Sequence, residues 1–157
     1  MRMFRSASRV LAASLLVAVL AGCGGGKAKK PASSLSAEDK AVIESYEEVR
    51  IALSDDDMRR VRAAGDRLRK SMEAKGVSAE ITKQVSAAKA ISETPRIDTM
   101  RGAFKDVSKG VLAVASEIEG YYVFESPMVV DGRWLQTTEK PGNPFLGRAL
   151  STLGNRK

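Results

Sequence analysis

The sequence predicts an all-α fold, an up-down four-helix bundle with an irregular or hairpin C-terminal tail packed on it. Three observations favour this fold class. Apolar residues recur every three or four positions in four successive segments between residues 36 and 118. The connections between these segments are short, which is typical of antiparallel neighbouring helices. After Gly120 this period stops, and an aromatic and β-branched run begins.

Residues 1–22 have the layout of a lipoprotein signal peptide. Three arginines within the first nine residues precede an apolar stretch from Val10 to Leu20, and Leu-Ala-Gly leads into Cys23, the only cysteine. This ending resembles a bacterial lipobox, in which the chain is cut before the cysteine and the thiol is acylated. An uncleaved transmembrane helix is disfavoured, because spanning a bilayer needs about 20 apolar residues. Cys23 is therefore the predicted lipid attachment site.

The expected location is the bacterial cell envelope, with the chain bound to the membrane through its lipid anchor. Gly24, rather than Asp, follows the cysteine. In a Gram-negative cell this choice resembles the sorting signal for the outer membrane, where the domain would face the periplasm. Residues 23–35 are rich in Gly, Lys, Ala, Pro and Ser and predict a flexible tether, followed by a folded domain over residues 36–157.

The four expected helices have recognisable starts and stops. Ser36 begins a capping box for the first, and the acidic run 54–57 supplies a cap for the second, which ends near Gly76. Ser78 is the expected cap of the third, which Pro95 closes. The fourth runs from Ile97 to Ile118 with a heptad spacing, so that a coiled-coil dimer is the alternative to packing within one bundle.

The tail contains signals for a small hairpin or an ordered loop. Residues 121–124 read Tyr-Tyr-Val-Phe, and an Asp-Gly turn at residues 131–132 precedes Trp134. Pro and Gly cluster at residues 141–144, and residues 146–153 are expected to form a terminal helical turn.

Composition excludes most familiar enzyme chemistry. The chain has no histidine, and lipidation would consume its single cysteine, so that a His-based general base, a thiolate nucleophile, a disulfide and an ordinary zinc site are all excluded. Acids such as Glu117, Glu119 and Glu125 are typical of a solvated surface. Interleaved acids and bases without an aromatic-studded basic stripe argue against a nucleic-acid partner. We therefore expect a protein that is not an enzyme and needs no cofactor.

The order of motifs in the tail resembles the C-terminal signature of a bacterial envelope domain of unknown function. That domain is also found attached to periplasmic adaptor proteins of heavy-metal efflux systems, and its signature reads Y-x3-C-P-M, then W-L, N-P-[YF]-x-G and M-x-x-C-G. The matching residues are Tyr122, Ser126, Pro127, Met128, Trp134, Asn143, Pro144, Phe145, Gly147 and Gly154, together with Arg101 and Phe104 of the fourth helix.

This chain departs from the family pattern at both cysteines. Ser126 and Leu153 stand at those positions, and Leu150 replaces a methionine, so that Met128 is the only soft-metal ligand left of that set. Met128 is a weak metal candidate, for which burial in the core is expected instead. The other motif residues, from Ser126 to Gly147, are interpreted as a structural clasp that folds the tail over the helices.

The leading functional prediction is a lipid-anchored, non-catalytic envelope protein whose helical domain binds a partner or ligand. The resemblance implies a setting in heavy-metal (copper) efflux or stress, with an envelope or efflux protein as the partner. Two alternatives stay open. One is direct soft-metal binding by Met128 together with Met58, Met72 or Met100, and the other is a purely structural envelope lipoprotein.

Overall fold

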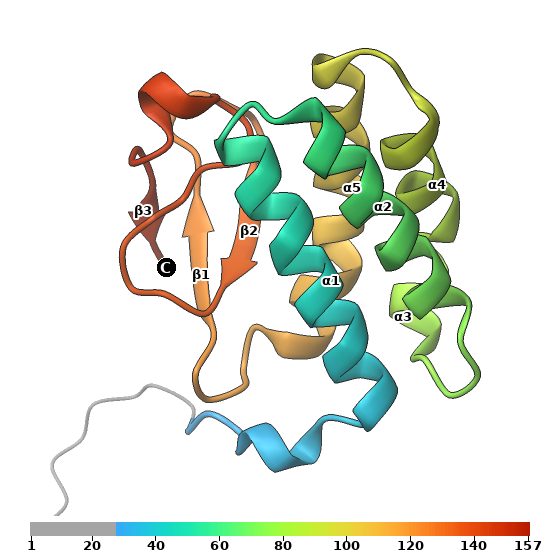
Figure 1. Cartoon of the computed structure of the whole chain (residues 1–157). Helices are drawn as coiled ribbons and strands as arrows, with labels where there is room; N and C mark the ends of the chain where they lie inside the picture. Colours follow the sequence, from blue (N-terminus) through green and yellow to red (C-terminus); the bar gives the residue numbers. More distant parts are fainter. Residues whose placement is uncertain (1–27) are drawn as a thin grey trace, which may run out of the picture.

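The computed structural model describes residues 28–157; the predicted signal peptide and Cys23 lie outside this range. Within it, no helix combines the length and apolar character needed to cross a membrane. Figure 1 shows the helices and the sheet side by side. The elements are η1 (Ala32–Ser34), α1 (Ala37–Ser54), α2 (Met58–Glu73), α3 (Ala79–Thr82), α4 (Val85–Glu93), α5 (Ile97–Ala115), β1 (Tyr122–Glu125), β2 (Arg133–Gln136), η2 (Arg148–Leu150) and β3 (Asn155–Arg156).

The all-α prediction is wrong, because the tail forms a three-stranded antiparallel sheet in the order β2-β1-β3. The predicted hairpin is present, with Phe124 of β1 opposite Trp134 of β2. Phe124, Trp134 and Leu135 are at most 2% exposed and belong to the same apolar core as the helices. The sheet is thus part of the fold rather than a tail packed on a finished bundle.

The first two helices begin as the sequence predicts. The Ser36 hydroxyl accepts the Asp39 N–H at 3.0 Å, and the Asp57 carboxylate accepts the Arg60 N–H at 3.0 Å. Ser78 lies at the start of α3, but its hydroxyl is buried without a hydrogen-bond partner among the described residues. Its backbone N–H instead donates to the Asp39 carboxylate at 3.1 Å.

The expected third helix is divided into α3 and α4. The chain leaves helical geometry at Gln84, where φ is −96° and ψ is 5°. Gly110 of α5 lies so close to this turn that a Cβ there would be 2.9 Å from the Glu80 carbonyl oxygen. The break lets α3 pack mainly on α5 while α4 contacts both α2 and α5.

Helix α5 lies at the centre of the fold. It ends at Ala115, before the predicted Ile118, and its apolar seam of Met100, Phe104, Val107 and Val111 has no exposed surface. Helices α3 and α4, strand β2 and, more weakly, α1 all contact α5. The chain itself therefore covers the seam, which favours the intramolecular alternative over a coiled-coil dimer.

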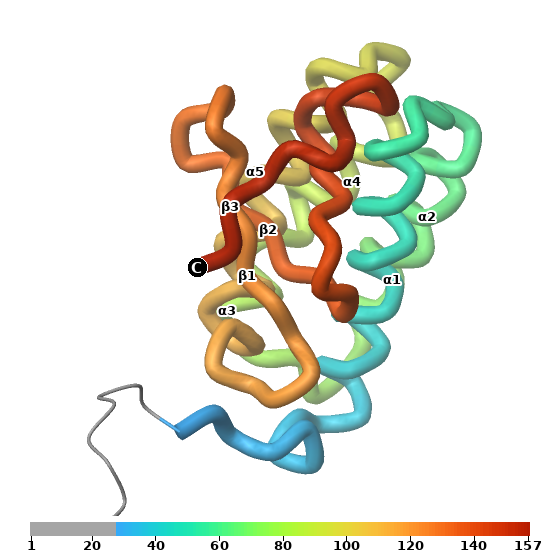
Figure 2. The backbone as a smooth tube through the Cα atoms, turned by 90° about the vertical axis from the view of Figure 1, so that its left-hand side faces the viewer, coloured from blue at the N-terminus to red at the C-terminus, as the bar shows by residue number. Residues whose placement is uncertain are grey.

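The predicted tether is packed on the domain over residues 29–35, which we call the docked segment. The Lys30 N–H donates to the Glu117 carbonyl at 2.7 Å, and the Glu119 N–H donates to the Lys30 carbonyl at 2.8 Å. Leu35 is 7% exposed and joins the core. Figures 1 and 2 place this segment at the end of the molecule where α1 begins and α5 finishes.

Candidate functional site

The residues of the tail motif fall in two places that the sheet brings together. Ser126, Pro127 and Met128 lie in the turn between β1 and β2, residues 126–132, which we call the hairpin tip. Asn143 to Gly147 lie in the irregular segment that follows β2, which we call the return segment (residues 141–147). Trp134, in β2, contacts both strand β1 and the return segment.

Asn143 joins the hairpin tip to the end of the chain. Its side chain has no exposed surface, and its amide nitrogen donates to the Ser126 hydroxyl at 3.2 Å and to the Leu153 carbonyl at 2.7 Å. Its amide oxygen accepts the Phe145 N–H at 2.8 Å, which forms the turn. Ser126 and Leu153 stand where the family that the tail resembles carries cysteine, and the Asn143 amide group connects these two positions here.

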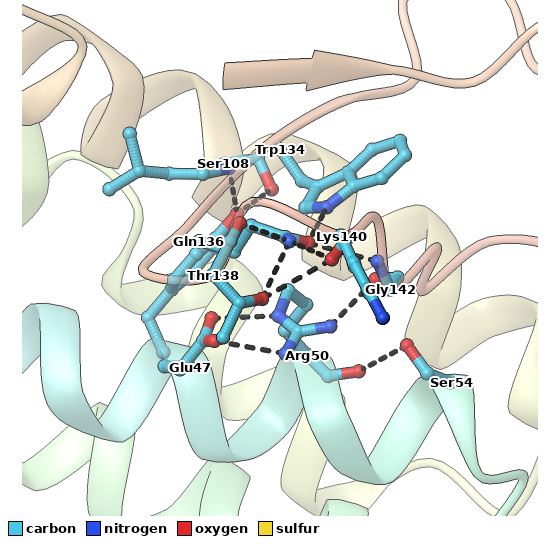
Figure 3. Close-up of polar contacts among 11 residues, drawn as sticks. Glu47, Arg50, Ser54, Ser108, Trp134, Gln136, Thr138, Lys140 and Gly142 are labelled. Atoms are coloured by element: carbon cyan, nitrogen blue, oxygen red, sulfur yellow. Dashed lines mark hydrogen bonds and ion pairs between the residues drawn. The ribbon is translucent and has the colours of Figure 1, made fainter. Parts of the chain in front are cut away.

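Gln136 holds the chain between β2 and the return segment. It is 1% exposed, and its amide oxygen accepts both the Trp134 indole N–H at 2.8 Å and the Gly142 N–H at 3.0 Å. Its amide nitrogen donates to the carbonyls of Thr138 and Lys140 at 2.7 and 2.6 Å. Figure 3 shows these bonds converging on one side chain. Sequence reasoning missed this role, because a polar residue in a short strand gives no signal of burial.

Arg50 connects helix α1 to the return segment. It is 6% exposed, and its guanidinium donates to both oxygens of Glu47 at 2.7 and 2.9 Å. A third bond, at 2.7 Å, reaches the Gly142 carbonyl (Figure 3). Bidentate contacts between arginine and a carboxylate are strong, and they fix the orientation of both groups. The sequence shows only an i,i+3 charge pair here and gives no sign that it is buried.

Asp56, in the loop between α1 and α2, holds the chain where the return segment ends, both directly at Arg148 and through Arg101. Its carboxylate accepts the Arg148 backbone N–H at 2.9 Å and the Arg101 guanidinium at 2.5 Å. The Arg148 N–H, followed by the Arg101 guanidinium, lowers the pKa of Asp56 from its ordinary value. Arg101 also donates to the Pro144 carbonyl at 3.1 Å. Gly147, with φ at 74°, passes beside this carboxylate.

Five aromatic rings run from helix α1 to strand β1. Tyr46 stacks on Phe104 with centroids 4.7 Å apart, and Phe104 lies 6.0 Å from Phe145. Phe145 meets the edge of Trp134 at 6.1 Å, and Trp134 stacks on Phe124 at 5.6 Å. Such pairs contribute about 0.5–1.5 kcal/mol each beyond the area that they bury. The rings therefore connect the helices to the sheet through the return segment.

The Tyr46 hydroxyl is the polar end of this aromatic row. It is within 2.9 Å of the Ser108 hydroxyl, and it accepts the Leu135 N–H at 3.1 Å. Burial raises the pKa of Tyr46 well above its ordinary value, and these hydrogen bonds lower it by less. The phenol therefore stays neutral and serves to position strand β2 on α1 and α5.

The hairpin tip presents two apolar side chains to solvent. Met128 is 65% exposed and Val130 is 82% exposed, so that the expected burial of Met128 is wrong. The backbone around them is nevertheless well bonded. The Ser126 N–H donates to the Gly132 carbonyl at 2.8 Å, and the Lys105 ammonium donates to the Val130 carbonyl at 3.3 Å.

The structure does not gather the methionines that a soft-metal site would need. Met72 and Met100 are 1% and 0% exposed and pack in the core, whereas Met128 lies on the surface. Met58 is partly buried against the core. Among residues 28–157, no group of three or more His, Cys, Asp or Glu side chains could hold a metal ion.

The surface of the domain has shallow depressions lined by charged side chains. The depression next to the hairpin tip has a volume of about 250 Å³ and is bordered by Asp98, Arg101, Gly102, Lys105, Val129 and Phe145. Of the three acids Glu117, Glu119 and Glu125, Glu125 forms an ion pair with Lys157, and this contact is the main cause that lowers the pKa of Glu125. A carboxylate held ionised in this way has no feature that marks a general acid.

Comparison with protein families, curated proteins and solved structures found no match to this chain. The similarity of the tail to the envelope domain therefore remains a prediction that rests on the motif residues alone.

Proposed function

We propose that this protein is a lipid-anchored, non-catalytic component of the bacterial envelope that binds a protein partner through its hairpin tip. The observation that carries the proposal is the exposure of Met128 and Val130, at 65% and 82%, on a turn that is held on both sides. Lys105 of α5 donates to the Val130 carbonyl, and Asn143 donates to the Ser126 hydroxyl. The lipid anchor is supported by the lipobox ending at Cys23.

The physical argument for partner binding rests on preorganisation. Burying apolar surface contributes about 25 cal/mol per Å², but a flexible segment loses much of this gain when it becomes ordered. The hairpin tip is already held by the bonds of Ser126 and Val130, so that Met128 and Val130 can be buried with little loss of conformational entropy. Methionine also adapts its shape to a partner's surface.

The kind of partner follows from the tail motif. The domain that the tail resembles is also found attached to adaptor proteins of heavy-metal efflux systems, so we propose an envelope or efflux protein as the partner and a role in copper or other heavy-metal stress. The hairpin tip is where Pro127 and Met128 of that motif reach solvent. A purely structural lipoprotein would need no such exposed pair.

Site-specific photocrosslinking in cells tests this proposal. A photoreactive residue is placed at Met128 or at Val130, with exposed Ala63 on helix α2 as the control position. We expect one discrete crosslinked protein from both tip positions and none from position 63. Val130→Glu should remove the crosslink from position 128, whereas Ala63→Glu should leave it. Crosslinks that are absent, or that are the same at all three positions, would contradict the proposal.

A further inference from the structure

The docked segment decides how freely the domain can move on its anchor. The sequence alone places the first ordered residue near Ser36, but Lys29 already donates to the Tyr121 carbonyl at 2.6 Å and lies 5.7 Å from the Tyr122 ring centroid. Lys30 forms a parallel bridge with Ile118. These contacts attach the chain entry to the loop between α5 and β1.

This attachment shortens the reach of the anchor by about half. From Cys23 to Leu35 the chain would span at most about 40–43 Å when fully extended. From Cys23 to Lys29 it spans at most about 20–22 Å. Helix α1 alone, with its 18 residues, is about 27 Å long. The linker between Cys23 and Lys29, which we call the anchor linker, is therefore shorter than helix α1 of the domain that it attaches to the membrane.

The two ends of the domain differ in what they offer. The docked segment and the loop at residues 117–121 lie at one end, and the hairpin tip points toward the other (Figures 1 and 2). Along α5, about 15 Å of helix separates Lys105, which contacts the tip, from Ala115 at the docked end. Because the short anchor linker joins the domain at the docked segment, it places that end of the domain nearest the bilayer.

We infer that the docked segment orients the domain on the membrane, so that the loop at residues 117–121 faces the lipid surface and the hairpin tip projects away from it. This inference rests on the proposed anchor at Cys23. Exposed Lys29 and Lys30 are balanced by exposed Glu117 and Glu119, so charge does not hold this face to an anionic bilayer. The shortness of the anchor linker provides the orientation, and it directs the hairpin tip toward a partner beyond the lipid surface.

Quenching by labelled lipid tests the orientation in the lipidated full chain. Because Cys23 is the only cysteine, Glu119→Cys and Val130→Cys each provide a single labelling site once Cys23 is acylated. Each introduced cysteine carries a fluorescent label, and the proteins are inserted into vesicles of phosphatidylethanolamine and phosphatidylglycerol. The lipid headgroups of these vesicles carry a spin label that quenches the fluorescence of a nearby label. We expect quenching at position 119 to exceed that at position 130 severalfold.

A matched variant lengthens the anchor linker and leaves the contacts of the docked segment unchanged. Twelve Gly and Ser residues inserted between Ala28 and Lys29 should reduce the difference between positions 119 and 130 to nearly nothing. Equal quenching in the original chain, or a difference that the insertion leaves intact, would overturn the orientation. Acylation is measured separately by mass spectrometry, and an unmodified Cys23 would overturn the proposed anchor instead.

Discussion

The helices and the tail bury their backbones by different means. In α1, α2 and α5 most core positions are apolar, as at Val42, Leu68 and Phe104, and the helices satisfy most of their own backbone groups. The chain after β2 has little regular structure, and buried Gln136 and Asn143 supply its hydrogen bonds instead. The tail therefore depends on a few polar side chains, whereas the helices depend on many apolar ones.

This difference explains how an exposed apolar turn can be held in place. A buried carbonyl or N–H without a partner costs about 1–3 kcal/mol, so an irregular segment persists only where side chains pair its backbone groups. Arg50, Gln136 and Asn143 do this for the return segment, and Asn143 also bonds to the hairpin tip. The comparison predicts that removing a buried polar side chain that bonds to the tail lowers the free energy of unfolding more than removing a polar side chain on the surface of a helix.

The largest effect is expected for Arg50→Ala. Removing one partner of a buried ion pair costs about 3–5 kcal/mol, and Arg50 also holds the Gly142 carbonyl. Arg67→Ala is the control, because Arg67 pairs with Glu48 on the surface with both side chains more than half exposed, where such pairs contribute about 0–1 kcal/mol. Urea unfolding measures both values. Similar losses for the two variants would show that the tail does not depend on buried polar contacts.

Two glycines sharpen the comparison at intermediate size. Gly147 has φ 74° and ψ 177°, and a Cβ would lie 2.8 Å from the Asp56 carboxylate oxygens, so Gly147→Ala should destabilise the protein by about 1–3 kcal/mol. Gly102 lies within α5 with nothing within 4 Å of a Cβ, so Gly102→Ala should stabilise it by about 0.5–1 kcal/mol. Thermal unfolding checks the opposite signs. Two shifts in the same direction would refute this account.

The smallest effect is the pH dependence contributed by Asp56. Because its pKa is lowered in the folded state, its contribution is fully present at neutral pH and is lost as the pH falls below about 5 and through the folded pKa. The Asp56 side chain is 46% exposed, so Asp56→Asn should cost at most about 1 kcal/mol at pH 7. The difference from the wild type should shrink toward pH 2 in denaturant titrations. A difference that stays constant with pH would contradict this role.

Local signals predicted the positions of most elements. Ser36 and Asp57 cap their helices as expected, and the Asp-Gly pair at residues 131–132 lies in the turn of the hairpin. The Arg148–Leu150 turn lies within the predicted terminal helical turn. The site was predicted less well, since the motif residues of the tail were identified but Met128 was expected to be buried. Arg50 and Asp56 were not identified as parts of the site.

What the sequence by itself determined is therefore local, namely the helix periods, the caps and the turn of the hairpin. Only the tertiary structure decided the division of the third helix, the third strand, the docked segment and the burial of the polar residues that hold the tail. These features join residues far apart in the chain, as in the bonds of Arg50 to Gly142 and of Asp56 to Arg148, each 92 positions apart. A periodic pattern reports which face of an element is apolar, but it does not report what that face meets.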